Sequence, residues 1–267
     1  MQFANIDGHV IHFQQIGAAK SKPTLVFVNP LGSDFRVWRD IIVQLAGDFA
    51  MLTYDKRGHG LSDRGGQMMV MEDHVWDLAN LLDHVGIQQA FVCGLSIGGM
   101  IAQGLAVARP EMVQGLILCD TGHKIGTAKT WQERIEAVED EGPEAVADAV
   151  IARWFTDEFK DAHAAEVRGF RNMIARQDTY GYIQSCNALA EADLTHVAPE
   201  IEAPTLLLCG DQDEVTSPAL MHELQGMISG ARLELIEGAA HVPAIEKPHV
   251  MADFIRNYAR EMVLETE

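Results

Sequence analysis

The stretch AFVCGLSIGGM, residues 90–100, decides the fold of this 267-residue chain. Its first residues form a short apolar run, which is typical of a buried strand, and the residues after it continue as an apolar helical pattern to about 108. Gly94 and Gly98 flank Ser96 in a Gly-x-Ser-x-Gly arrangement. Because glycine has no side chain, this spacing permits a sharp strand-to-helix turn that lifts the serine hydroxyl above the sheet edge. The stretch therefore predicts an α/β unit that presents Ser96 as a nucleophile.

Further β-rich runs lie on both sides of this stretch. Helical patterns separate most of them, and a helix over 244–263 closes the chain. Asp7-Gly8 is a two-residue turn signal between alternating runs, which predicts an amino-terminal hairpin. Apolar strands separated by helices indicate a mostly parallel sheet with helices on both faces. We expect strands at 24–29, 49–55, 90–94, 116–120, 203–210 and 232–238, and further helices at 36–46, 70–85 and 97–108.

The segment 121–199 breaks this alternation. It contains no convincing β run, and its apolar residues follow helical spacing. A long helical insertion in a regular sheet often covers the active site. We therefore predict a core formed by 1–120 and 200–267, with a helical cap over 121–199.

Composition restricts the partners. The chain carries 20 basic and 39 acidic residues, a net charge of −19. This charge repels nucleic acid and anionic lipid, so we expect neither nucleic acid nor membrane as a partner. No apolar run is long enough to span a bilayer, and the start lacks a secretory pattern. The four cysteines lack the close Cys/His spacing of a zinc site and suit a reducing compartment, so we expect a cytoplasmic protein without metal or cofactor.

A serine hydroxyl needs a base to become a good nucleophile. Among the 11 histidines, His241 directly follows the last predicted strand, in a loop of small residues. His59 and His123 remain possible pocket residues, although neither follows that strand. The sequence therefore predicts His241 as the base.

An acid must hold this histidine. Asp211 and Asp213 follow the strand at 203–210, at the sheet edge where catalytic loops gather. We favour Asp213 over Asp211, with Asp120 as a third candidate because it also ends a strand. The chain order of nucleophile, acid and histidine, Ser96, Asp213 and His241, is that of a known hydrolase arrangement.

The negative oxygen that develops during attack on a carbonyl needs two fixed donors. The backbone N–H of Ile97 directly follows the nucleophile and supplies one. The loop after the strand at 24–29 supplies the other, and Leu31 is its natural donor because Pro30 has no N–H.

Together these motifs resemble the α/β-hydrolase superfamily, and more narrowly the 3-oxoadipate enol-lactonases of aromatic catabolism. The similarity includes N-x-L-G at 29–32, Y-D-x-R-G-H-G-x-S-D at 54–63 and C-G-L-S-I-G-G-M at 93–100. In the cap it includes Trp131 and Arg134. Pro30 and the stretch 122–124 depart from the family pattern. Because both could flank the pocket, these departures bear on which substrate is expected and not on the type of reaction.

The resemblance implies an eight-stranded, mostly parallel sheet with a helical cap. It also implies a serine hydrolase that opens a small, carboxylate-bearing enol lactone through an acyl-enzyme and releases 3-oxoadipate. Trp131 and Arg134 would contact this anionic lactone or ester. A guanidinium suits a carboxylate, so we expect at least one cap arginine to face the pocket, from Arg134, Arg153, Arg168, Arg171 and Arg176.

Two alternatives remain at this stage. The same triad would serve a carboxylesterase, another lactonase or a cofactor-free perhydrolase. A non-catalytic ligand-binding protein on the same scaffold is the alternative from another class, and the complete triad weighs against it.

Overall fold

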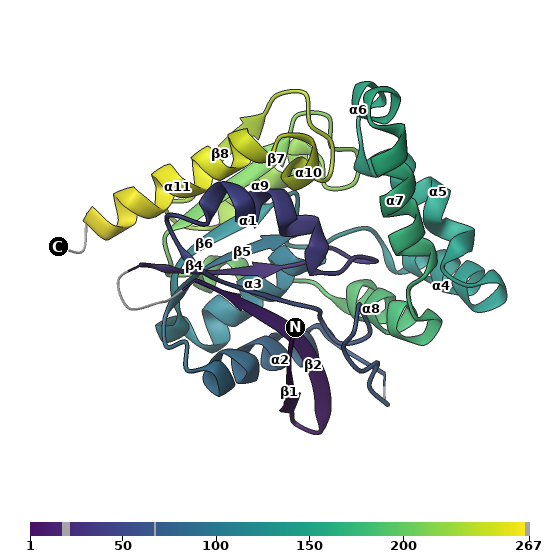
Figure 1. Ribbon diagram of the computed structural model, residues 1–267, viewed down its shortest axis with the longest axis horizontal. Coiled ribbons are helices and arrows are strands. Elements are labelled where there is room, and N and C mark those ends of the chain that lie inside the picture. The colour runs from purple at the N-terminus through teal and green to yellow at the C-terminus, as the bar shows by residue number, and fades with distance from the viewer. Residues whose placement is uncertain (18–21, 67, 265–267) are drawn as a thin grey trace.

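The sheet determines where the site lies. The computed structural model describes residues 1–17, 22–66 and 68–264. Within them, eight strands form one sheet in the order β1-β2-β4-β3-β5-β6-β7-β8 (Figure 1). The pairs β1–β2 and β2–β4 are antiparallel and all others are parallel, which confirms the predicted architecture. The strands are β1 Gln2–Ile6, β2 His9–Ile16, β3 Thr24–Val28, β4 Ala50–Tyr54, β5 Ala90–Leu95, β6 Val113–Cys119, β7 Thr205–Gly210 and β8 Arg232–Ile236.

The amino-terminal hairpin forms as the turn signal predicts. Asp7 and Gly8 both have positive φ, 48° and 87°, the backbone that a tight two-residue hairpin turn requires. The Asn5 side chain accepts a hydrogen bond from the Gly8 N–H at 2.9 Å. This hairpin extends the parallel sheet on one side, next to β4.

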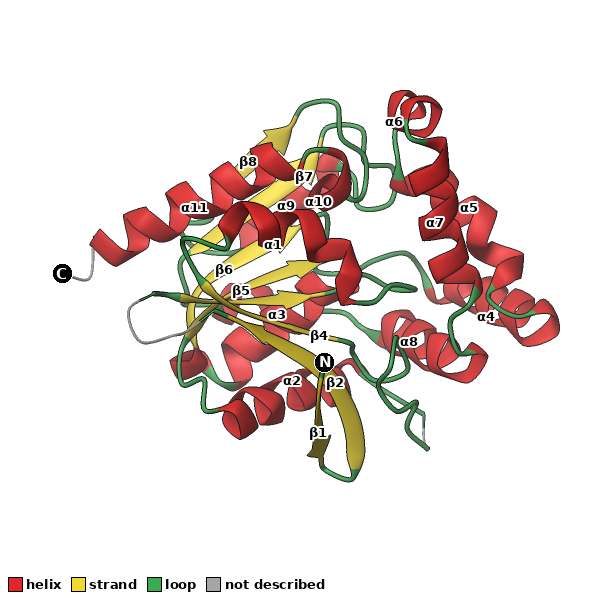
Figure 2. Ribbon diagram, viewed as in Figure 1, coloured by secondary structure: helices red, strands yellow, loops and turns green. Residues whose placement is uncertain are grey.

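Helices cover both faces of the sheet (Figure 2). On one face α1 packs against α11, and on the other α2 packs against α3. The predicted closing helix is two helices, because Pro248 lacks the N–H that would continue the first. The predicted helix at 36–46 likewise begins as a short 3-10 turn. The core helices are η2 Phe35–Trp38, α1 Arg39–Leu45, α2 Met71–Val85, α3 Ile97–Ala108, η3 Pro110–Met112, η4 Ala198–Glu200, α9 Pro218–Met227, α10 Pro243–Glu246 and α11 Pro248–Leu264.

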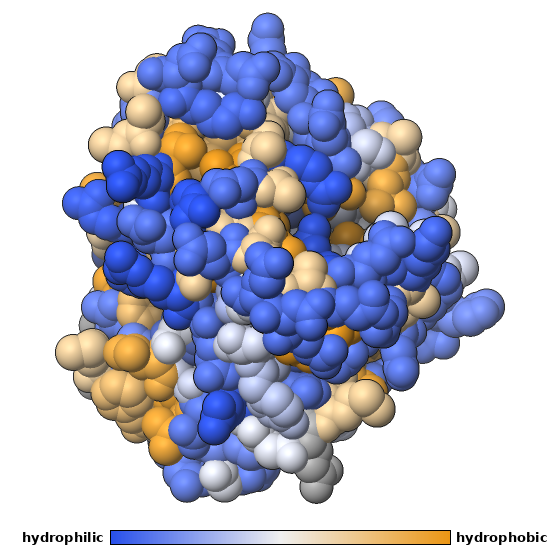
Figure 3. All heavy atoms as spheres, turned by 90° about the vertical axis from the view of Figure 1, so that its right-hand side faces the viewer, coloured by the Kyte–Doolittle hydropathy of each residue, from blue (hydrophilic) through white to orange (hydrophobic). Residues whose placement is uncertain are grey.

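Five helices, here called the cap helices, follow β6. They gather at the side toward which the parallel strands point (Figure 1). Helix α8 approaches the core closely, since a Cβ on Gly58 would lie 2.7 Å from the Gly181 Cα. Seen from this side, the surface is mostly hydrophilic with small hydrophobic areas (Figure 3). The cap helices are α4 Ala128–Glu141, α5 Glu144–Trp154, α6 Asp157–Ala162, α7 Ala164–Ala175 and α8 Thr179–Glu191.

The topology creates a crevice for a site. Strand β3 pairs with β4 on one side and with β5 on the other. The loop after β3 leads to α1 on one face of the sheet and the loop after β5 leads to α3 on the other face, so the two loops separate from each other. Ligands of open α/β sheets bind at such points, beyond the carboxyl ends of the strands. Among the described helices, none is both long and apolar enough to cross a membrane.

Candidate active site

The turn after β5 holds Ser96 in a strained conformation. Its φ and ψ are 59° and −122°, a region that non-glycine residues rarely adopt. A Cβ on Gly94 would lie 2.2 Å from the Gly98 oxygen, and one on Gly98 would lie 2.1 Å from the Val28 oxygen. The two glycines are therefore required for strand β3 and helix α3 to meet at this turn. The backbone of Ser96 is fixed on both sides, because its N–H donates to the Cys119 carbonyl at 3.0 Å and its own carbonyl accepts from the Thr121 hydroxyl at 2.6 Å.

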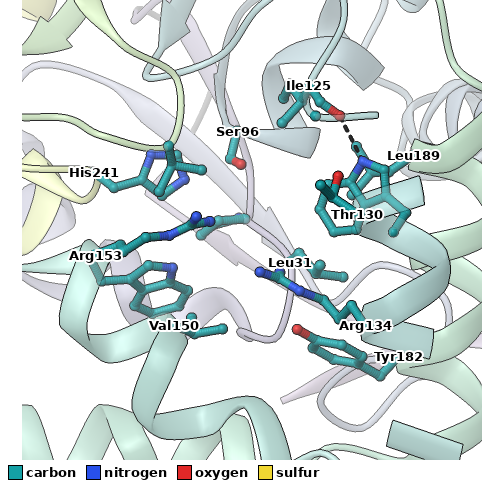
Figure 4. A pocket seen from close by; sticks show the side chains of 15 residues that line it. Leu31, Ser96, Ile125, Thr130, Arg134, Val150, Arg153, Tyr182, Leu189 and His241 are labelled. Carbon is teal, nitrogen blue, oxygen red and sulfur yellow. Dashed lines mark hydrogen bonds between the residues drawn. The ribbon is translucent and has the colours of Figure 1, made fainter. Parts of the chain in front are cut away.

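The three predicted triad residues come together. The Nδ1 of His241 lies 2.9 Å from Oδ2 of Asp213, and both side chains are buried. Ser96 and His241 line one cavity of about 200 Å³, and both are labelled in Figure 4. Since Nδ1 of His241 is engaged with the carboxylate, Nε2 is the nitrogen left for a proton from Ser96.

Asp213 is held ionised. Burial by itself would raise the pKa of this carboxyl group, but the neighbouring His241 and hydrogen bonds from Thr216 and Val215 outweigh it and keep the pKa below its usual range. The Thr216 hydroxyl donates to Oδ2 at 2.7 Å, and the Val215 N–H donates to Oδ1 at 2.7 Å. A permanently charged Asp213 can orient the imidazole and stabilise its protonated form.

Neither competing acid hydrogen-bonds to His241 among the described residues. Asp211 is exposed and accepts a hydrogen bond from the Gly238 N–H at 2.9 Å. Asp120 is fully buried, and its Oδ1 accepts from the Gly210 N–H at 2.8 Å. Burial and then the nearby Asp213 charge raise the pKa of Asp120 well above its usual value, which favours the neutral form of this carboxyl group.

One buried group of side chains has donor atoms close enough for a cation. Asp120, Cys209 and Asp213 each place one within 4.8 Å of the others. Burial raises the pKa of the Cys209 thiol as it does that of Asp120, which favours the protonated form of both groups. Protonated groups make poor ligands, and the donor set suits a hydrogen-bonded cluster better than a metal site.

The two other histidines are not beside Ser96. His59 lies behind the loop after β3, where its Nε2 accepts the Gly32 N–H at 3.0 Å. Burial, followed by the neighbouring Lys56, lowers the pKa of His59 and keeps it neutral. His123 is partly buried, and its carbonyl accepts from the Leu194 N–H at 2.7 Å. Neither histidine lines the cavity.

The predicted oxyanion donors lie beside Ser96. Pro30 and Leu31 line the cavity together with Ser96. The Leu31 N–H donates to no acceptor within residues 1–17, 22–66 and 68–264. Ile97 is the first residue of α3, and N–H groups in the first turn of a helix have no partner inside it. Both N–H groups are therefore available to a ligand.

The cap contributes the opposite wall, with two arginines in it. Figure 4 shows the guanidinium groups of Arg134 and Arg153 pointing into the cavity, Arg134 near Tyr182 and Arg153 on the side of His241. The Arg134 guanidinium carbon lies 5.0 Å over the Trp131 ring, whose Nε1 donates to the Ile125 carbonyl at 2.6 Å. Partial burial and the charge of Arg134 lower the pKa of Arg153.

The other three cap arginines lie outside this cavity. Arg171 forms ion pairs with Asp148 and Glu144 on the outside of the cap. Arg168 and Arg176 are exposed and do not line this cavity. By contrast, no carboxylate of the described residues pairs with Arg134 or Arg153. Two cations without an anion therefore face the same space as Ser96.

Two supporting residues were not predicted. Thr216 fixes the Asp213 carboxylate, and its spacing of three residues after an aspartate is a recognisable turn signal. Glu246 accepts the Ala240 N–H at 2.6 Å and both the N–H and the hydroxyl of Thr156 at 2.8 Å. It thus joins the loop before His241 to the cap, a contact between distant segments that no local pattern signals.

Known proteins share this architecture. Residues 23–248 match the family described as alpha/beta hydrolase fold. The chain is 33% identical to 3-oxoadipate enol-lactonase 2 of Acinetobacter baylyi, over 96% of this chain and 93% of that protein. The crystal structure of the enol-lactonase from Burkholderia xenovorans aligns with a TM-score of 0.92 at 31% identity, covering 98% of this chain and 100% of the other. A thermophilic esterase from Thermogutta terrifontis with malate bound aligns with a TM-score of 0.90 at 27% identity, over 98% and 99% of the two chains. The chain therefore belongs to the α/β-hydrolase family, as its motifs predict.

Proposed function

We propose that this protein is a serine hydrolase that opens a small, carboxylate-bearing enol lactone, with 3-oxoadipate enol-lactone as its substrate. The observation that carries the proposal is the meeting of Ser96 and the His241–Asp213 pair with two unpaired arginines in one small cavity. The relatives named as enol-lactonases support the same assignment.

The chemistry follows from the positions of the side chains. Ser96 Oγ bonds to the lactone carbonyl carbon while its proton passes to Nε2 of His241. The N–H groups of Leu31 and Ile97 stabilise the negative oxygen. When the ring C–O bond breaks, the leaving enol oxygen takes the proton from His241 and the enol tautomerises to a ketone. The opened chain remains as an ester on Ser96, and water activated by His241 hydrolyses this ester and restores the serine.

The cavity also suits the size and charge of the substrate. Its volume of about 200 Å³ is below the roughly 300–1,000 Å³ of sites for drug-sized ligands. Arg134 and Arg153 supply positive charge to the substrate carboxylate, although the whole chain is strongly acidic. At physiological salt, charges farther away than about 8 Å are largely screened, so these two side chains dominate the local potential.

A second candidate is a carboxylesterase for short anionic esters. The esterase with malate bound supports it, because malate is itself a small carboxylate. This enzyme would use the same triad and the same arginines on an open-chain substrate.

A substrate panel separates the two candidates. The enol lactone, followed by its ultraviolet absorbance, is compared with p-nitrophenyl esters with and without a terminal carboxylate. We expect kcat/KM to be highest for the lactone. Preference for an anionic ester identifies the carboxylesterase, and turnover of neither with binding of a small ligand rejects catalysis.

Variants test the carboxylate contact. Arg134→Gln and Arg153→Gln should each raise KM for the lactone by about tenfold or more, because a charge-assisted hydrogen bond contributes roughly 1.5–3 kcal/mol. Arg168→Gln is the matched control, since Arg168 is an exposed cap arginine outside the cavity. An unchanged KM in both cavity variants would reject the electrostatic part of the proposal.

A further inference from the structure

A buried lysine lies behind the loop that supplies the first oxyanion donor. Lys56 follows β4 in the loop 55–60 and is only 1% exposed. Its Nζ donates to the Pro30 carbonyl oxygen at 2.8 Å. No carboxylate of the described residues lies within 4.0 Å of this ammonium. It is unfavourable to bury an ammonium group whose hydrogen-bond partner is a backbone carbonyl and not a carboxylate. The presence of a lysine at this position therefore needs a reason other than packing.

The reason lies in the peptide unit that Lys56 holds. The Pro30 carbonyl and the Leu31 N–H belong to one planar peptide bond, which is trans, so the two groups point in opposite directions. The Ser33 hydroxyl donates to the same carbonyl oxygen at 2.9 Å. With its oxygen held by two donors on the side away from the cavity, the peptide directs the Leu31 N–H toward the space beside Ser96.

Other contacts anchor the loop but leave this peptide free to rotate. The Asn29 side chain donates to the Tyr54 carbonyl at 2.8 Å, and the Gly32 N–H donates to His59 at 3.0 Å. These bonds fix the residues before and after the peptide. Rotation about the two single bonds that flank it would turn the Pro30 carbonyl toward the cavity and the N–H away. Among the hydrogen bonds of the described residues, those to the Pro30 carbonyl oppose such a flip directly.

We propose that Lys56 is a positioning residue for the oxyanion hole, because its bond to the Pro30 carbonyl fixes the Leu31 N–H toward the reacting carbonyl oxygen. Its positive charge also polarises the peptide and strengthens the N–H as a donor. The inference rests on the proposed function, in which Leu31 is an oxyanion donor. Ser33 is the second positioning group on the same atom.

Neighbouring carboxylates compensate only part of the cost of burying the Lys56 ammonium. Burial lowers the pKa of Lys56 to about 7, while the more distant carboxylates of Asp55 and Asp34 act in the opposite direction. The imidazoles of His59 and His74 also lie near it, and both have lowered pKa values, with burial the largest cause and Lys56 a further one. A packing role alone would be served better by an apolar side chain.

The test uses Lys56→Met and Ser33→Ala with a p-nitrophenyl ester as substrate. Lys129→Met is the control, because Lys129 is an exposed lysine on α4. Loss of one oxyanion donor lowers kcat by roughly 10²–10³-fold. We expect Lys56→Met to lower kcat by about 10- to 100-fold, since Ser33 still holds the carbonyl, with KM changed less than twofold. Ser33→Ala should show a smaller loss of the same kind.

A second readout separates positioning from general damage. A trifluoromethyl ketone forms a hemiketal with the serine, and its oxyanion occupies the same hole as the transition state. Its inhibition constant should rise by about the factor by which kcat falls, while the inhibition constant of a non-covalent carboxylate stays unchanged.

Two results would overturn the inference alone: wild-type kcat in Lys56→Met, or a lower kcat with unchanged affinity for the ketone. If Lys56→Met does not fold, Ser33→Ala decides by the same two criteria. A wild-type protein that hydrolyses neither ester nor lactone would reject the proposed function, and this inference with it.

Discussion

Replacing Lys56 by methionine should make the protein more stable while making it less active. Burial lowers the pKa of Lys56 from 10.5 to about 7. One pKa unit corresponds to about 1.36 kcal/mol, so holding the ammonium in the folded protein costs about 5 kcal/mol at low pH. Removing the ammonium also removes its hydrogen bond to the Pro30 carbonyl, which offsets about 1.5–3 kcal/mol of the gain in stability. We therefore expect the free energy of unfolding to rise by about 1–3 kcal/mol at pH 7.

The pH dependence of this difference follows from the direction of the pKa shift. Between pH 7 and pH 10.5 the unfolded wild-type chain carries a proton on Lys56 that the folded protein lacks. Wild-type stability therefore rises with pH in this window, and methionine removes that contribution. The advantage of Lys56→Met over wild type should shrink by about 2.5 kcal/mol from pH 6 to pH 9.

Urea unfolding of both proteins at several pH values, followed by tryptophan fluorescence, measures this difference directly. Titrating groups that do not interact with Lys56 contribute equally to both proteins, so their contributions cancel in the comparison. A variant that is less stable than wild type at pH 7, by an amount that does not change with pH, would show that no buried charge is being removed.

Three further substitutions test the site and the turn. Asp213→Asn should lower kcat by about 10⁴-fold, as loss of a triad acid does, while Asp211→Asn stays within about threefold; steady-state kinetics gives both. Asp120→Asn should keep kcat within about threefold, because the raised pKa of Asp120 favours a neutral carboxyl group that an amide resembles in shape and charge. The raised pKa of Asp120 makes wild-type stability fall as pH rises above the pKa of the unfolded chain, and unfolding experiments at pH 5 and 8 should find this fall reduced in the variant. Gly98→Ala should destabilise the protein by about 3 kcal/mol or prevent folding, since its Cβ would lie 2.1 Å from a backbone oxygen. The control is Gly169→Ala, in an open position on α7, which should stabilise the protein by roughly 1 kcal/mol. A thermal melt measures both.

Much of the site was predictable because it depends on strand ends. Loops after parallel strands meet at one edge, so the positions of Ser96, Asp213 and His241 along the chain were enough to place them together. The hairpin turn was predictable for a similar reason, because it depends on two adjacent residues, Asp7 and Gly8. The break before Pro248 was also visible in the sequence, and the prediction of a single closing helix missed it.

The cap and the loop interiors were harder to predict. Which arginine faces the cavity depends on how α4 and α5 pack on the core. Helical spacing alone gives Arg134 no advantage over Arg168; the family resemblance singled out Arg134, whereas Arg153 was one of five candidates. Lys56 lies in a loop without periodicity, so nothing local indicates that its side chain turns inward to the Pro30 carbonyl. Such directions are set by contacts between segments far apart in the chain.

The central claim is that Ser96 becomes covalently acylated. Mixing the protein with the enol lactone, quenching in acid within milliseconds and mapping the peptides by mass spectrometry tests it directly. We expect an adduct of the mass of the whole lactone on the peptide containing Ser96 of the wild-type protein, trapped by the quench before water hydrolyses the ester, and no such adduct in Ser96→Ala. Turnover of the lactone by Ser96→Ala at the wild-type rate, or an adduct on another residue, would contradict it.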